Sequence, residues 1–194
     1  MARITDPSKL EKIKEATISL IVEKGYGGAS VSAIAAKAGV AEGYLYRHYT
    51  GKNELVHQLF NENIHVFIEH VRKVMDEYIN FESFLRKYIL GLVELINRSP
   101  DKTKFFVQLI NDFTFEVSDK TKKQVFSICN TLLKLGKKKH EISDSCTIID
   151  IYTVIVIIPL QVFSLYLKGF FGKVKLDKES ASMVATTCLK IVRK

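Results

Sequence analysis

The segment Ser30–Glu54, SVSAIAAKAGVAEGYLYRHYTGKNE, determines the fold expected for this chain. Ser30 can cap a helix, because its hydroxyl accepts the backbone N–H groups that a helix start leaves unpaired. Small and apolar residues follow at helical spacing up to Gly39, a residue that ends helices in the left-handed conformation without strain. A second, short and aromatic helix is expected over Ala41–Tyr49. Together these are the parts of a helix-turn-helix, whose second helix enters the major groove of DNA.

The positive charge of the chain is not concentrated in this segment. The 194 residues carry a net charge of +8, with a pI near 9.3, which suits a polyanionic partner. Residues 1–57, however, hold eight Lys/Arg and six Asp/Glu, a net charge of only +2. The net charge is therefore weak support for DNA binding, and that prediction rests on the helix-turn-helix motif.

The sequence offers little for catalysis or for a metal. Its three cysteines, Cys129, Cys146 and Cys188, are widely spaced, with no CxxC pair and no histidine cluster at zinc spacing. They are expected to be reduced and mostly buried, as in a cytoplasmic protein. No Ser/His/Asp, Cys/His or phosphate-loop arrangement appears. We therefore expect neither an enzyme nor a cofactor.

The N-terminus and one apolar run bear on a membrane location. The start of the chain becomes charged within a few residues and has no apolar signal core. The run Ile151–Leu167 falls short of about 20 clean apolar residues and contains Pro159 and Gln161. A transmembrane helix is the lesser alternative, and a helix buried on several sides is preferred. A cytoplasmic location is expected.

The rest of the chain has helical spacing throughout. A first helix is expected from Asp6-Pro7, with helical spacing up to Gly25 and with Tyr26 and the Gly27-Gly28 pair as its end. A long helix is expected from Lys52 to about Tyr78. Further helices are expected over Phe81–Ile96, Asp101 to about Glu116, Asp119 to about Leu135 with a stop at Gly136, Ile142–Gly169, and Val174–Lys194. The predicted fold is all-α with about nine helices, in a helix-turn-helix domain over residues 1–51 and a helical domain over residues 52–194.

Residues Val22–Val56, VEKGYGGASVSAIAAKAGVAEGYLYRHYTGKNELV, resemble the tetracycline-repressor (TetR) family of bacterial transcription factors. The shared positions are Gly25-Tyr26, Ile34-Ala35, Ala38-Gly39-Val40, Gly43, Leu45-Tyr46, His48-Tyr49, Lys52 and Glu54-Leu55. The remainder of the chain resembles the family only in helix number and length. The resemblance implies a homodimer on double-stranded operator DNA, a ligand pocket in the second domain, and pairing of the last two helices with a second subunit.

The resemblance assigns contacts with backbone phosphates to Tyr46, His48 and Lys52. A phenol O–H, an imidazole N–H and an ammonium beside a helix N-terminus suit that role. Ser30 and Ser32 begin the helix before the turn and are candidates for a further phosphate. For Ser30, a role as a helix cap alone is an equal alternative.

Base reading is expected from the exposed start of the second helix, from Ala41, Glu42, Gly43, Tyr44 and Arg47. Two of these depart from the family pattern, which commonly has Ser or Thr in place of Ala41 and Thr in place of Tyr44. An alanine cap costs about 1 kcal/mol of helix-end stability. Tyr44 either covers a thymine methyl or reaches a phosphate, and Glu42 either reads cytosine or only favours the helix dipole. Arg47 is left open between guanine, a phosphate and the first helix.

The second domain is rich in aromatic residues, and all twelve phenylalanines lie after residue 59. Some of them are candidates for lining a pocket for an apolar or aromatic ligand, with plain core packing as the alternative for each. The candidates are Phe60, Phe67, Phe84, Tyr88, Phe105, Phe106, Phe113, Phe126 and Tyr152, with His65, Gln108 and Asn111 for polar contacts. Pro159 frees the carbonyl of Ile155, which either bends the helix or offers an acceptor to the ligand.

The most apolar helices are expected to hold two copies of the chain together. The run Ile148–Leu167 and the helix Glu179–Val192 suit an isologous four-helix interface. Its expected members are Ile149, Val156, Leu160, Phe163, Val184 and Cys188. The expected function is a repressor released from a palindromic operator when an apolar ligand moves the long helix. A DNA-binding activator or organiser without a small-molecule effector is the alternative.

Overall fold

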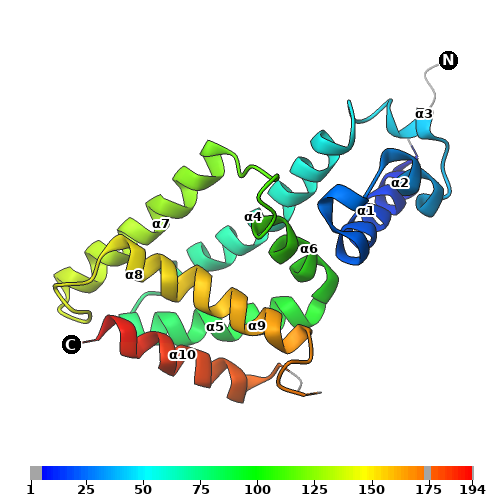
Figure 1. Cartoon of the computed structure of the whole chain (residues 1–194). Coiled ribbons are helices and arrows are strands. Elements are labelled where there is room, and N and C mark those ends of the chain that lie inside the picture. Colours follow the sequence, from blue (N-terminus) through cyan, green and yellow to red (C-terminus); the bar gives the residue numbers. More distant parts are fainter. Residues whose placement is uncertain (1–5, 173–175, 194) are drawn as a thin grey trace. The chain divides into compact units, whose positions relative to one another are not determined.

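The computed structural model describes residues 6–172 and 176–193. Within these residues every regular element is a helix, which confirms the all-α prediction (Figure 1). The run Ile148–Leu167 is continuous, and with it counted as one helix the described residues form nine. They divide into two compact units. The head unit holds the residues up to Ile64 together with Asp101–Phe115, and the body unit holds His65–Pro100 and the residues from Glu116 on.

The first helix, α1 (Pro7–Gly28), begins and ends as predicted. Its start is capped by Asp6, whose carboxylate accepts the N–H of Ser8 at 3.0 Å. Gly25 lies at φ 78° and ψ 170°, so it kinks the helix without ending it, and the helical turns resume to Gly28. The predicted end of the helix at Tyr26 and the Gly27-Gly28 pair is therefore confirmed.

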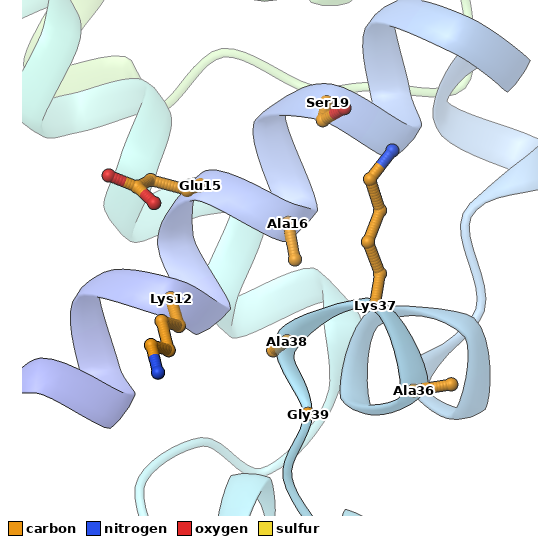
Figure 2. Close-up of a pocket in the computed structure, with 8 residues that line it drawn as sticks. All are labelled: Lys12, Glu15, Ala16, Ser19, Ala36, Lys37, Ala38 and Gly39. Atoms are coloured by element: carbon orange, nitrogen blue, oxygen red, sulfur yellow. The ribbon is translucent and has the colours of Figure 1, made fainter.

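Small residues allow α2 (Val31–Ala38) to pack closely against α1. Figure 2 shows the side chain of Ala16 on α1 pointing toward Ala38 on α2, and both are buried. Beside this contact lies an open groove of about 500 Å³. Its lining residues are Lys12, Glu15, Ala16, Ser19, Ala36, Lys37, Ala38 and Gly39.

Both ends of α2 have the caps that the sequence predicts. The hydroxyl of Ser30 accepts the N–H of Ala33 at 3.1 Å. Gly39 adopts φ 67°, and its N–H donates to the carbonyl of Ala36. The N–H of Val40 donates to the carbonyl of Ala35, so the orphan carbonyls of the last turn are paired. The helix and the glycine turn are thus confirmed.

The next helix, α3 (Glu42–Leu45), is shorter than the predicted Ala41–Tyr49. The N–H groups of His48 and Tyr49 both donate to the carbonyl of Leu45, each at 3.0 Å. Two donors on one carbonyl close a turn, because a regular α-helix uses each carbonyl once. The chain therefore leaves α3 in turns and enters α4.

The long helix α4 (Lys52–Asp76) passes from one unit to the other, in the head unit up to Ile64 and in the body unit from His65 on. It ends close to its predicted end. The next helices are α5 (Phe81–Arg98) and α6 (Pro100–Ile110). The prediction that α6 extends to about Glu116 is wrong, because the carboxylate of Asp112 accepts the N–H of Thr114 at 2.8 Å and forms a turn.

The next helix, α7 (Asp119–Lys138), continues through the glycine that was predicted to stop it. Gly136 is a close-approach residue here, since a Cβ on it would lie 2.8 Å from the Cδ1 of Ile142. The following helix was predicted to begin at Ile142 and instead begins at Ile148. A capping box between Thr147 and Asp150 fixes that start, because each side chain accepts the backbone N–H of the other residue.

A proline shapes the most apolar helical run, which consists of α8 (Ile148–Tyr152), the π-helical turn η1 (Thr153–Ile157) and α9 (Ile158–Leu167). Pro159 has no N–H, so the carbonyl of Ile155 lacks its helical partner. The buried hydroxyl of Tyr88 on α5 donates to this carbonyl at 2.9 Å. The carbonyl of Ile155 therefore has a hydrogen-bond partner within the chain itself.

The apolar run is long enough and apolar enough to cross a membrane, the one such helix among the described residues. Only 33% of its most apolar window is buried by its own chain. The prediction of a helix buried on several sides is therefore met only in part by the single chain. The last helix, α10 (Lys178–Val192), begins behind the cap residue Asp177. Its predicted start at Val174 lies outside the described residues.

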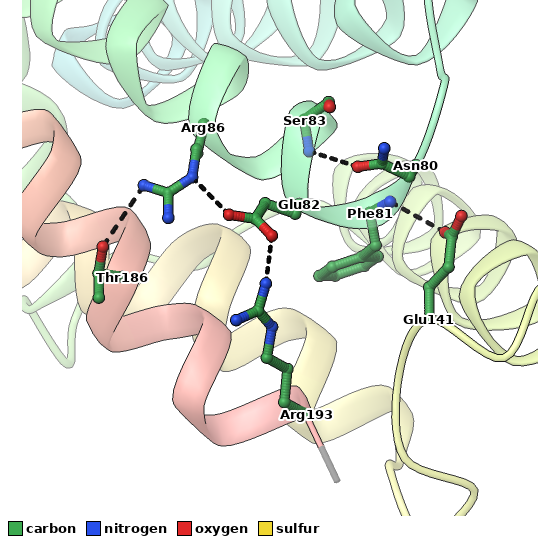
Figure 3. A network of polar contacts seen from close by, with 8 residues as sticks. All are labelled: Asn80, Phe81, Glu82, Ser83, Arg86, Glu141, Thr186 and Arg193. Carbon is green, nitrogen blue, oxygen red and sulfur yellow. Dashed lines mark hydrogen bonds and ion pairs between the residues drawn. The ribbon is translucent and has the colours of Figure 1, made fainter.

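Polar contacts tie the start of α5 to the chain after α7 and to the end of α10 (Figure 3). The carboxylate of Glu141 accepts the N–H of Phe81 at 2.9 Å and the hydroxyl of Tyr78 at 2.5 Å. Glu82 forms ion pairs with Arg86 and Arg193. The junction between α4 and α5 is therefore held from two sides within the body unit.

Candidate DNA-binding site

Most of the predicted base-reading residues are on the surface of the head unit. Ala41, Glu42, Gly43 and Arg47 are exposed. Ala41 takes the N-cap position of α3 with extended backbone and forms no side-chain hydrogen bond to the helix. The missing cap agrees with the sequence, because alanine has no side-chain acceptor. These four residues are available to a base edge.

Tyr44 differs from them because it is half-buried against the start of α1. Its hydroxyl donates to the carbonyl of Asp6 at 3.3 Å, and its ring lies 4.9 Å from the ring of His48. The ammonium of Lys9 and the guanidinium of Arg47 lie 5.6 and 5.7 Å from the same ring. Tyr44 thus joins α3 to the N-terminal end of α1, a role that the sequence did not reveal.

The three predicted phosphate contacts have different surroundings. Tyr46 is 54% exposed, and His48 and Lys52 are half-buried. Of the two serines, Ser32 is exposed, whereas the hydroxyl of Ser30 is used as the cap of α2. A serine cap keeps its own donor hydrogen, so both proposed roles of Ser30 are compatible.

The side chain of Lys52 contacts Tyr26 near the end of α1. Its ammonium donates to the carbonyl of Tyr26 at 2.9 Å and lies 4.4 Å from the centre of the Tyr26 ring. The hydroxyl of Tyr26 donates to the Oδ1 atom of Asn53 at 2.8 Å. Burial, and next to it the charge of Asp112, raise the pKa of Tyr26, so the phenol stays protonated as the donor. The start of α4 is therefore locked to the end of α1.

Further polar contacts stiffen the head unit. Lys14 on α1 donates to both carboxylate oxygens of Glu62 on α4, each at 3.0 Å. Glu54 accepts the N–H of Thr50 at 2.6 Å and so caps the turn before α4. These contacts join α1 to α4 and fix the turn that leads into α4.

The groove of Figure 2 is a poorer candidate for an anion than α3 and its neighbours. The ammonium of Lys37 in its wall is paired with Glu23 at 2.5 Å, and Glu15 adds a negative charge. None of the predicted DNA-contact residues lines it.

The predicted pocket residues do not form one set. In the head unit, Phe60, Phe105 and Phe106 are buried and Phe113 is fully exposed. Phe113 has no covering side chain because it lies in the turn after α6, which leaves it on the surface. In the body unit, Phe84 and Tyr88 are buried and their rings stack at 6.0 Å. Phe67 and Tyr152 are half-buried, and Phe126 is 48% exposed.

The predicted interface residues also divide by burial. Ile149 is 68% exposed, and Val156 and Leu160 are half-buried. Phe163, Val184 and Cys188 are buried within their own chain. A side chain that its own chain covers has no apolar area left to bury against a second copy. The exposed apolar side chains on these helices are Ile149, Ile157, Met183 and Ile191.

The head matches a known family model. Residues 13–59 match the model described as bacterial regulatory proteins, tetR family. An HTH-type transcriptional regulator of Staphylococcus aureus strain USA300 is 26% identical over 121 residues, which are 55% of this chain and 65% of that protein. A second, from strain MRSA252, is 31% identical over 106 residues, 50% of this chain and 57% of that protein. The matched part of the chain thus spans less than two thirds of these relatives.

Solved structures resemble the whole fold. The fatty acid degradation regulator FadR from Bacillus halodurans superimposes with a TM-score of 0.77 at 21% identity, over 95% of this chain and 100% of that chain. The regulator FadR from Bacillus subtilis, solved in complex with stearoyl-CoA, gives 0.77 at 20% identity with the same coverage. The family model and the Staphylococcus aureus relatives are those of transcriptional regulators, in agreement with the expectation that this protein is not an enzyme.

The start of α3 has no side-chain cap, and a substitution there tests this feature. Ala41→Ser supplies the missing acceptor to the first N–H groups and should raise the free energy of unfolding by about 0.5–2 kcal/mol in urea titrations. Ala36→Ser is the matched control, because Ala36 is exposed inside α2, where serine has a slightly poorer helix propensity than alanine. Equal stability of Ala41→Ser and the unchanged protein would contradict the account of this helix start.

Proposed function

We propose that this chain, which belongs to the TetR family of bacterial regulatory proteins, is a cytoplasmic homodimeric repressor that an apolar ligand releases from a palindromic operator. The observation that carries the proposal is the head unit, where a capped α2, a left-handed Gly39 and a short α3 present polar side chains together. This is the geometry in which a helix-turn-helix reads the major groove.

In this proposal the residues of the head divide into two groups. Tyr46, His48 and Lys52 bind backbone phosphates and set the orientation, as their exposed or half-buried donors allow. Glu42 and Arg47 reach base edges from the exposed side of α3. Gly43 lets the backbone approach the DNA closely, and Tyr44 offers only the part of its ring that α1 leaves uncovered.

The operator complex should be strongly salt-dependent. With 6–10 phosphate contacts per dimer, affinity should fall roughly 10³–10⁵-fold between 50 and 200 mM salt in an anisotropy titration. Tyr46→Phe removes one neutral hydroxyl donor per head, so it should weaken operator binding at every salt concentration and leave the slope of log K against log salt unchanged, because that slope follows the number of phosphates neutralised by charged groups. Tyr49→Phe is the control, because Tyr49 is a tyrosine of the same head that is buried and has no proposed DNA contact. A flat salt response of the unchanged protein would refute DNA binding through this head.

The uncovered helices of the body support the homodimer. Two thirds of the apolar run are not buried by the chain itself, and α10 exposes Met183 and Ile191. A second copy that packs the same helices against these would bury both faces in a four-helix bundle. The proposed interface therefore keeps Ile149, Val156 and Leu160 and adds the exposed residues of α10.

A charge in that interface should separate the subunits. Leu160→Glu places an unpaired carboxylate in an apolar contact and should give monomers in sedimentation velocity that no longer bind the operator. Val66→Glu is the control, since Val66 is an apolar residue of α4 that is 50% exposed outside the proposed interface. A dimer that survives Leu160→Glu unchanged would remove these helices from the interface.

We propose a long-chain acyl-CoA as the effector, and the neighbour solved with stearoyl-CoA supports this class. A long acyl chain suits a helical unit whose interior is lined by aromatic and aliphatic side chains. Binding would move α4, the continuous helix that runs from the body unit to the head unit. Because Lys52 begins that helix, the movement would change how the two heads meet successive major grooves.

Stearoyl-CoA should therefore weaken operator binding by about 5–150-fold, the range of 1–3 kcal/mol of coupling, and the operator should weaken stearoyl-CoA binding equally. Titrations of each ligand at saturating amounts of the other measure both factors. Coenzyme A without the acyl chain is the control. An acyl-CoA that binds without weakening the operator complex would refute the switch, and no acyl-CoA binding at all would refute the ligand class.

A further inference from the structure

We propose that Phe115, which follows α6 and lies 63 residues after Lys52 in the sequence, is a positioning residue for the DNA contact of Lys52. The inference rests on the proposed function in one respect, the assignment of a phosphate contact to Lys52. It goes beyond that function because it names the side chain through which the chain after α6 controls this contact.

The ammonium of Lys52 is held in its position by Tyr26. The Tyr26 carbonyl takes one ammonium hydrogen of Lys52 at 2.9 Å, and the face of its ring attracts the same charge at 4.4 Å. An ammonium has three donors, so hydrogens remain for a phosphate oxygen. Lys52 is half-buried, so its reach toward DNA depends on where Tyr26 lies.

Tyr26 in turn is positioned by Phe115. The two rings meet edge to face, with centroids 5.6 Å apart at 81°. Phe115 is 7% exposed, and it stacks on His57 at 4.7 Å and packs against Phe60 at 4.9 Å. His57 and Phe60 belong to the same part of α4 as Lys52. Phe115 therefore packs between Tyr26, near the end of α1, and the residues His57 and Phe60 of α4.

Phe115 is itself held in a defined turn. Its N–H donates to the carbonyl of Asp112 at 3.1 Å, and the Asp112 carboxylate accepts the N–H and the hydroxyl of Thr114. These hydrogen bonds lower the pKa of Asp112, and the charge of Lys52 lowers it further. One turn earlier, Gln108 lies against Gly25, whose added Cβ would be 3.5 Å from the Nε2 atom. The segment after α6 is thus built into the head unit at several points.

This arrangement gives the segment a regulatory meaning. Residues 101–115 belong to the head unit, and the chain continues directly into the body unit at Glu116. A displacement of the turn would move Phe115 away from Tyr26. Tyr26 would then no longer hold the ammonium of Lys52 in its position. One phosphate contact per head would then weaken while α2 and α3 stay folded.

The test is the salt dependence of operator binding by Phe115→Leu in the full-length protein. The slope of log K against log salt should fall to that of Lys52→Ala, about 0.9 per head below the unchanged protein. Phe105→Leu is the matched control, because Phe105 is equally buried in α6 and has no ring contact with Tyr26. It should lower stability to a similar extent and leave the slope unchanged.

A double-variant cycle separates positioning from plain destabilisation. In the Lys52→Ala background, Phe115→Leu should change operator affinity by less than about twofold, because the contact it positions is already absent. Additive losses, or an unchanged slope in Phe115→Leu, would overturn the inference. If Phe115→Leu does not fold, Phe115→Met, which keeps most of the side-chain volume, replaces it.

The same experiment distinguishes the inference from the proposed function. A protein that binds no operator refutes the function itself. An unchanged slope in Lys52→Ala refutes the phosphate role of Lys52, and with it the inference, while DNA binding through Tyr46 and His48 would stand.

Discussion

The rest of the head depends on the junction between the end of α1 and the start of α4, where Lys52 donates to the carbonyl of Tyr26 and the hydroxyl of Tyr26 donates to Asn53. It closes a loop of chain that holds α2, the glycine turn and α3, because Tyr26 ends α1 and Lys52 begins α4. The short α3 is also held by the hydrogen bond from Tyr44 to the carbonyl of Asp6 and by the buried side chain of Leu45, because four residues are too few for a helix to be stable alone. The carbonyl uses one donor of Lys52 and leaves others for DNA, so one side chain serves both fold and function.

The head was predictable from the sequence because its signals are local. Ser30 caps α2 three residues away, and Gly39 takes its left-handed conformation from its own lack of a side chain. Such effects act within a turn or two and need no knowledge of distant packing. The all-α fold followed for the same reason, from apolar residues at helical spacing.

The sequence-based predictions were wrong where a residue distant in the sequence determines the local structure or the burial of a side chain. Gly136 was predicted to end α7, but it is an approach point for Ile142, and Pro159 frees a carbonyl that Tyr88 then binds from another helix. Phe163 and Cys188 are as apolar as Ile149, yet only the last is exposed, and burial cannot be read from residue type. The position of Phe115 beside Tyr26 is of this kind, because nothing in the sequence between them signals the contact.

The claim at the centre of this account is that two copies of the head bind one DNA site together. Footprinting of the full-length protein on sites selected from genomic DNA tests it most directly. We expect two protected half-sites, related by a twofold axis, whose centres lie about one helical turn of DNA, or a multiple of it, apart. A single unsymmetrical half-site, or protection without any selected sequence, would contradict it.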